Sequence, residues 1–317
     1  MRHGGPPGAG AFVPRGTARE ARLRAPRGGA SLPRMTGPSP DSTPPWRDTP
    51  PALWRTGAGF LLFVVFYAVL LSLWFIALTP IISAMMAGRQ VATLVMLSSF
   101  AVALLALELV LRLLHGRGLG VLIGSLPLTL RQGGRVLLYA LPVVLVISLL
   151  PMSEALEPRR YLSTGTWLRW LVPGLTAVAI QVSAEEFLFR GYLQGRLQAR
   201  LDHPALWLGL PALIFGALHF DATAGDNAIW FVVSAAAFGL AAGDLTARAG
   251  TLGPALALHF LNNCIALLGV SFGDELGGLA LYHLTIRQDD PALLPLIPVE
   301  LASTFVLWLT ARLALRR

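Results

Sequence analysis

Long apolar stretches with few or no charges dominate the chain from about residue 57 onward, and short polar clusters separate them. The first stretch, 57–78, has 22 residues and no charge, which is enough for a helix to cross a bilayer core of about 30 Å. Seven further stretches follow, at 91–111, 133–152, about 167–200, 205–220, 228–243, 252–272 and 291–309. The pattern therefore predicts an all-α fold, a polytopic transmembrane helix bundle of about eight spans.

Proline and weaker apolar patterns add two expectations about the elements. Pro142 lies inside the third stretch and is expected to break that helix. The segments 118–130 and 276–286 are apolar but short, and they are expected to lie at the membrane interface.

Composition supports a lipid-facing surface. The chain of 317 residues is 55% hydrophobic and 13% charged, whereas soluble domains carry about 25% charged residues. The single cysteine, Cys264, cannot form an intrachain disulfide, and the chain has no cysteine pattern for zinc or an iron–sulfur cluster.

The first 55 residues have a different character. They are rich in Pro, Gly, Arg, Ser and Thr and lack an apolar period, which predicts a disordered, basic N-terminal tail (1–55) ahead of a transmembrane domain (56–317). Translation from Met35 is an alternative that would remove seven of the nine Arg in this tail.

The distribution of Arg predicts the orientation. All 25 basic residues are Arg, which is typical of a GC-rich bacterial genome, and the net charge is +8. If eight spans start from a cytoplasmic N-terminus, 20 Arg fall on the cytoplasmic side and five on the other. The positive-inside rule thus favours two cytoplasmic termini in a bacterial inner membrane, and it explains the basic charge better than nucleic-acid binding does.

Ionisable residues within spans are expensive, so they indicate function. The fourth stretch contains Glu185 and Glu186, followed by Arg190. Glu186 and Arg190 are four residues apart on one helix face and are expected to pair. Glu185 is rotated about 100° away and has no basic partner on its helix, so it is the candidate proton acceptor.

Two other stretches contribute polar groups. The fifth ends in His219, and the seventh carries His259 and Asn263 on one helix face. Imidazole and carboxamide groups can bind a metal or donate hydrogen bonds to an oxyanion. With a rise of about 1.5 Å per residue, Glu185 and His219 share a depth of roughly 20 Å, provided that the fourth span continues to about residue 200.

These strings resemble the motifs of the CAAX-protease and bacteriocin-processing family of intramembrane proteases, also called the abortive-infection family. Glu185, Glu186 and Arg190 match its Glu-Glu-x-x-x-Arg motif. Phe215 and His219 match Phe-x-x-x-His. The third motif, His-x-x-x-Asn/Asp, is matched by His259 and Asn263. The resemblance covers about residues 170–270.

The resemblance implies roles for these residues. Glu185 would activate a water together with His219, and His259 and Asn263 would stabilise the oxyanion. Glu186 and Arg190 would support the site. A divalent metal such as zinc, held by Glu185, His219 and His259, is one alternative, and water activation without a metal is the other.

The substrate class and two rival functions remain open at this point. The resemblance implies a peptide or membrane-protein substrate in the lipid bilayer, with leader-peptide removal or CAAX-type processing as examples. Glu185 and the two histidines would also suit a proton- or ion-coupled transporter, or they would persist in a non-catalytic membrane partner protein. Oligomeric state has no signature in the sequence.

Overall fold

The computed structural model describes residues 1, 52–85, 88–148 and 156–316 of the chain. Everything from residue 52 onward belongs to one compact unit, Pro38–Arg317. Met35 and nearly all of the predicted tail lie outside the described residues, so the alternative start and the disorder of the tail stay predictions.

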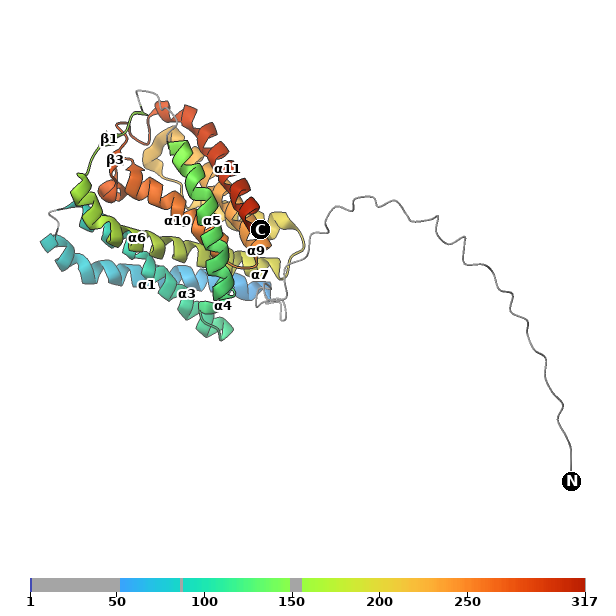
Figure 1. Cartoon of the computed structure of the whole chain (residues 1–317). Helices are drawn as coiled ribbons and strands as arrows, with labels where there is room; N and C mark the ends of the chain where they lie inside the picture. Colours follow the sequence, from blue (N-terminus) through green and yellow to red (C-terminus); the bar gives the residue numbers. More distant parts are fainter. Residues whose placement is uncertain (2–51, 86–87, 149–155, 317) are drawn as a thin grey trace, which may run out of the picture. The chain divides into compact units, whose positions relative to one another are not determined.

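The described part of the chain consists mostly of helices (Figure 1). Its α-helices are α1 (Leu53–Met85), α2 (Arg89–Ser98), α3 (Phe100–His115), α4 (Gly120–Ile123), α5 (Leu126–Ser148), α6 (Thr164–Glu186), α7 (Gly195–Gln198), α8 (Leu210–Ala217), α9 (Ala228–Ala249), α10 (Gly253–Cys264) and α11 (Ile297–Leu315). Its π-helices are η3 (Phe187–Gln194), η4 (Ala205–Gly209) and η6 (Ile265–Gly269), and its 3₁₀ helices are η5 (Ala222–Asn227), η7 (Glu275–Leu279) and η8 (Pro291–Leu296).

Six helical stretches in the described residues are long and apolar enough to cross a membrane. They are Leu53–Pro80, Arg89–His115, Leu126–Ser148, Thr164–Gln198, Ala222–Ala249 and Pro291–Leu315. Two shorter apolar helices, Ala205–Ala217 and Gly253–Gly269, fall on the two remaining predicted spans. The predicted polytopic helical bundle is therefore confirmed, and the chain is an integral membrane protein.

Two predictions about the helices need correction, one about where α1 begins and one about a break at Pro142. Helix α1 begins at Leu53, so the last residues assigned to the tail are helical. Helix α5 continues from Leu126 to Ser148 with Pro142 inside it. A proline removes one helical hydrogen bond, and in a membrane helix neighbouring groups can compensate for that loss; the expected break is absent.

Helix α10 is held closely by its neighbours α5, α6 and α9. Where α10 begins, a Cβ on Gly253 would lie 2.2 Å from the carbonyl oxygen of Thr129 on α5, so only glycine allows this approach. A Cβ on Gly216 of α8 would likewise lie 2.7 Å from the Val232 carbonyl oxygen on α9. Small residues at such crossings are typical of membrane helix pairs, and here they bring α10 against α5 and α8 against α9.

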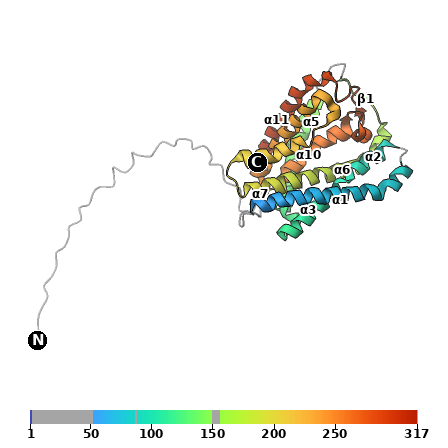
Figure 2. The ribbon, with the colours of Figure 1, turned by 180° about the vertical axis from the view of Figure 1, so that it is seen from behind.

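A small sheet joins the ends of several helices. β1 (Arg159–Arg160) pairs antiparallel with β3 (Tyr282–His283), and β3 pairs in parallel with β2 (Val270–Ser271). The segment predicted at the interface, 276–286, thus contains a 3₁₀ helix and a strand. Figure 2 shows the opposite side of the bundle, where α1 lies along α3 and α3 along α6.

Candidate active site

Helix α6 ends with the two acidic residues of the first motif. Glu185 and Glu186 are its last two residues, and the π-helix η3 begins at Phe187 and contains Arg190. Helix α6, η3 and α7 together form one stretch, Thr164–Gln198, which confirms the expected continuation of the fourth span. The sequence did not predict the π-helix, a conformation that is frequent at functional sites.

The predicted pair of Glu186 and Arg190 is confirmed. Arg190 Nη1 donates to Glu186 Oε1 across 3.0 Å, and both side chains are buried. The guanidinium also lies 4.5 Å from the centre of the Phe215 ring. Among the residues that the structure describes, Glu186 Oε2 and Arg190 Nη2 have no hydrogen-bond partner, and an unpaired polar atom is expensive in an apolar interior.

The side chain of His259 lies between the two carboxylates of α6. Its Nδ1 is 2.7 Å from Glu186 Oε1 and its Nε2 is 3.5 Å from Glu185 Oε2. A neutral imidazole has one N–H and one lone pair. If Nδ1 carries the N–H that donates to Glu186, a second ring hydrogen, on Nε2, would point toward Glu185 Oε2. The ring of His259 thus contacts both carboxylates of α6.

Gln181 is a member of this network that the sequence reasoning missed. Its Nε2 donates to Glu185 Oε1 over 2.7 Å, and its Oε1 accepts from Asn263 Nδ2 over 2.8 Å. A signal was present, because Gln181 precedes Glu185 by four residues and shares its helix face. The contact with Asn263 crosses from α6 to α10 and had no signal in the sequence.

Aromatic rings surround the polar network. Phe215 lies 6.0 Å from the ring of His259, and Phe238, on α9, lies 4.9 Å from it, between ring centres. Phe215 also contacts Phe189 edge-on at 5.2 Å. Such an environment lowers the local dielectric constant and strengthens every charge interaction within it.

His219 occupies a different position from the other predicted site residues. It lies just beyond the end of α8 and is exposed in the isolated chain. Its Nδ1 is 2.8 Å from the Phe215 carbonyl oxygen, and its ring packs 4.6 Å from the Phe215 ring. Among the described residues, Phe215 therefore connects His219 to the site, and the expected direct cooperation of His219 with Glu185 is not seen as a hydrogen bond or ion pair.

The fit of a metal can be tested against the donor atoms. Across the described ranges, no three His, Cys, Asp or Glu side chains are grouped so that they could hold a metal ion. The predicted ligand set of Glu185, His219 and His259 is therefore not assembled, and both ring nitrogens of His259 already face carboxylates. Metal dependence stays a prediction, and no step below depends on a metal.

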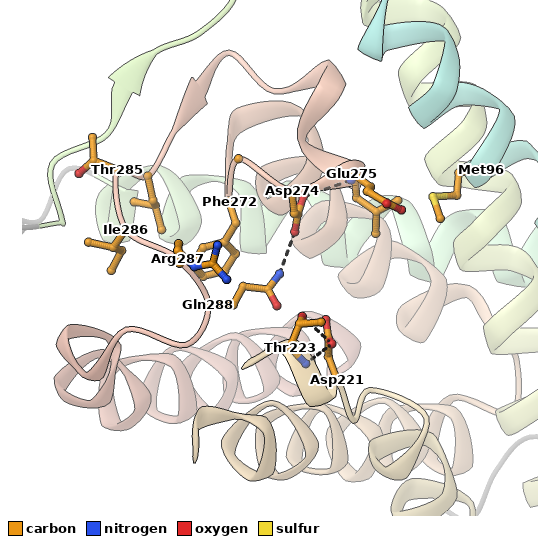
Figure 3. Close-up of a pocket in the computed structure, with 13 residues that line it drawn as sticks. Met96, Asp221, Thr223, Phe272, Asp274, Glu275, Thr285, Ile286, Arg287 and Gln288 are labelled. Carbon is orange, nitrogen blue, oxygen red and sulfur yellow. Dashed lines mark hydrogen bonds between the residues drawn. The ribbon is translucent and has the colours of Figure 1, made fainter. Parts of the chain in front are cut away.

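A pocket of about 660 Å³ lies among the loops that follow α8, β2 and β3 (Figure 3). Its polar groups bind one another: Asp274 accepts from the Leu276 N–H and from Gln288 Nε2, and Asp221 accepts from Thr223. The hydrogen bonds from the Thr223 side chain and backbone hold the pKa of Asp221 below its usual range. None of the predicted site residues lines this pocket, so it is separate from the network around His259.

Comparison with known proteins points to one family. Residues 166–265 match the model of the Rce1-like family, described as type II CAAX prenyl endopeptidase Rce1-like. The uncharacterized protein YyaK of Bacillus subtilis (strain 168) is 27% identical over 126 residues, which are 39% of this chain and 42% of that protein. The chain thus aligns with less than half of that relative, and no solved structure matches it. The matched segment carries all four candidate catalytic residues, and the match confirms the predicted resemblance.

Proposed function

We propose that the protein is an intramembrane endopeptidase that hydrolyses a peptide bond with water activated by Glu185. The observation that carries this proposal is the position of His259 between two carboxylates, with Glu185 Oε2 left without a hydrogen-bond partner in the described part of the chain. A carboxylate oxygen that is uncommitted and next to a donor is the arrangement that general-base catalysis requires.

In the proposed reaction, Glu185 Oε2 takes a proton from a water molecule while the water oxygen attacks the peptide carbonyl carbon. The carbonyl oxygen becomes an oxyanion, which accepts hydrogen bonds from His259 Nε2–H and Asn263 Nδ2–H. Preorganised donors of this kind contribute about 10²- to 10³-fold each to kcat. Collapse of the tetrahedral intermediate breaks the C–N bond, and Glu185 returns its proton to the departing amine.

Glu186 has a defined part in this scheme. Its carboxylate accepts from His259 Nδ1–H, and this bond fixes the orientation of the ring. Arg190 in turn holds Glu186 Oε1 in place. The pair thus acts on the reaction through His259, and His259 is the donor that meets the substrate.

The proposed substrate is a peptide or a membrane protein that reaches the site from the bilayer. The apolar walls around His259 suit a hydrophobic segment near the scissile bond. We propose leader-peptide removal or cleavage of a membrane protein in a bacterial inner membrane, with access from the cytoplasmic half. Cleavage restricted to the outer face of oriented vesicles would contradict that direction of access.

The test is cleavage of a broad peptide library by purified, detergent-solubilised protein. Wild type is compared with Glu185→Ala, His259→Ala and His219→Ala, each with and without a chelator. We expect wild type to cleave and Glu185→Ala and His259→Ala to lose at least about 100-fold in rate. Retained cleavage in folded Glu185→Ala would overturn the proposed mechanism.

Two arms of the same experiment test further points: the chelator tests metal dependence, and His219→Ala tests the role of His219. Loss of wild-type cleavage in the chelator, with recovery when a divalent cation is restored, would show that a metal takes part. Loss of cleavage in His219→Ala with unchanged stability would show that His219 moves onto the substrate during the reaction. If wild type and all variants are inert although folded, the transporter and partner-protein alternatives gain support.

A further inference from the structure

Gln181 connects the proposed base with the proposed oxyanion donor. Its side chain is buried, with 7% of the residue exposed, and its two polar atoms bond to different helices. The Nε2 atom donates to Glu185 Oε1 on its own helix, and the Oε1 atom accepts from Asn263 Nδ2 on α10. The two catalytic candidates are therefore joined through one amide.

When Glu185 is ionised, the amide of Gln181 can form this bridge in a single orientation. A carboxylate accepts hydrogen bonds and cannot donate them, so the NH₂ group of Gln181 must face Glu185. The carbonyl oxygen of Gln181 then faces Asn263, which must present its own NH₂ group. The remaining oxygen, Asn263 Oδ1, lies 3.4 Å from Asn262 Nδ2. The orientation of the Gln181 amide thus determines how the Asn263 amide points.

This orientation leaves one carboxylate oxygen of Glu185 and one amide hydrogen of Asn263 available for the reaction. Glu185 Oε1 is engaged by Gln181, and Oε2 is left for the water and for His259. Asn263 Nδ2 has two hydrogens, of which Gln181 takes one and the other remains for the oxyanion. Without Gln181, both carboxylate oxygens would compete for the water and the Asn263 amide could rotate by 180°.

We propose that Gln181 is a positioning residue, which selects the catalytic oxygen of Glu185 and holds the Asn263 amide with one hydrogen directed at the oxyanion. This inference rests on the proposed endopeptidase function. The contacts of Gln181 act on transition-state geometry and not on substrate binding. Loss of these contacts should therefore lower kcat and leave KM nearly unchanged.

The test compares Gln181→Leu and Gln181→Glu with wild type and Glu185→Ala on the library peptide that wild type cleaves best. Thr176→Val is the matched control, because Thr176 is an exposed residue of α6 whose hydroxyl donates to its own helix, at the Val172 carbonyl. We expect Gln181→Leu to lose about 10- to 100-fold in kcat, the usual effect of small misplacements, with KM within about twofold.

Gln181→Glu provides a rescue that depends on pH. A neutral carboxylic acid at position 181 can donate to Glu185 and accept from Asn263, as the amide does, whereas the ionised form repels Glu185. The kcat of this variant, divided by that of wild type at the same pH, should therefore rise as the pH is lowered. A merely structural defect would give a ratio that does not change with pH.

The outcomes separate this inference from the proposed function. If wild type cleaves, Glu185→Ala does not, and Gln181→Leu keeps its kcat, the positioning role is overturned and the protease remains. If wild type is inert, the contact is tested by unfolding of Gln181→Leu, Asn263→Leu and the double variant. Non-additive losses of stability would support the bridge, and additive losses would overturn it.

Discussion

At the residue scale, the site is a linear network of buried polar groups that spans two helices. It runs from Asn263 through Gln181 and Glu185 to His259, and from there through Glu186 to Arg190. A network of this kind is stable only while nearly every member keeps its partner, because each unpaired buried group costs about 1–3 kcal/mol. Single substitutions should therefore be more damaging than paired ones.

Glu186→Leu tests this expectation. The substitution leaves the buried guanidinium of Arg190 without its ion pair, and breaking such a pair costs about 3–5 kcal/mol of unfolding free energy. The double variant Glu186→Leu with Arg190→Met removes both charges and should cost less than Glu186→Leu alone. The measurement is equilibrium unfolding in mixed micelles, and equal stability of Glu186→Leu and wild type would contradict the prediction.

The two histidines should respond differently to removal. His259→Ala leaves two carboxylates facing each other without the ring and should lower the unfolding free energy by about 1–3 kcal/mol. His219 is exposed and lies beyond the end of α8, so His219→Ala should change stability by no more than about 0.5 kcal/mol. Thermal unfolding of the two purified variants in one detergent provides the comparison; equal losses would show that His219 is also part of the buried network.

At the scale of elements, close helix crossings determine where the polar groups meet. Gly253 is the first residue of α10 and allows this helix to approach α5 closely. His259 lies six residues later on the same helix. A separate local feature is a π-helix after two of the motifs. The π-helix η3 follows Glu186, and η6 follows Cys264, the residue after Asn263. The crossing at Gly253 fixes the approach of α10 to α5, and His259 is carried on α10.

Gly253→Ala should push α10 and α5 apart. The added Cβ would lie 2.2 Å from the Thr129 carbonyl oxygen, and this contact is with backbone, which cannot rotate away. Overpacking of this kind costs about 1–3 kcal/mol, and the displaced His259 should also reduce cleavage. Gly134→Ala on α5 is the control, because no atom lies within 4 Å of its Cβ position; equal behaviour of the two variants would refute the close crossing.

At the scale of the whole molecule, the positive-inside pattern predicts which loops share a side of the membrane. The loop at Arg248 between α9 and α10 is expected in the cytoplasm, and the loop at Asp289 before η8 on the other side. The positions are exposed enough to label: the side chain of Arg248 is 40% exposed and that of Asp289 is 43% exposed.

Single cysteines decide this topology. In a Cys264→Ser background, Asp289→Cys should react with a membrane-impermeant maleimide added to intact cells, and Arg248→Cys should react only after the cells are opened. Both variants should label equally in detergent, which controls for reactivity. Labelling of both positions in intact cells, or of Arg248→Cys alone, would contradict two cytoplasmic termini.

The sequence alone determined those features that local periodicity controls. Apolar stretches of sufficient length predicted the bundle and its spans, because backbone groups in lipid must be satisfied within a helix. The pairing of Glu186 with Arg190 followed from a four-residue spacing on one helix. Three ordered motifs carried the resemblance to a protease family, and they named His259 and Asn263 without indicating what either one touches.

The tertiary structure alone decided the contacts between helices. It placed His259 between two carboxylates, joined Asn263 to Gln181, and, within the described ranges, connected His219 to the site through Phe215. Each of these depends on how α6, α8 and α10 pack within the bundle, where glycines bring α10 against α5 and α8 against α9. Helical spacing fixes the direction of a side chain relative to its own axis, whereas the distance to another helix is set by packing, and a one-dimensional pattern does not contain that distance.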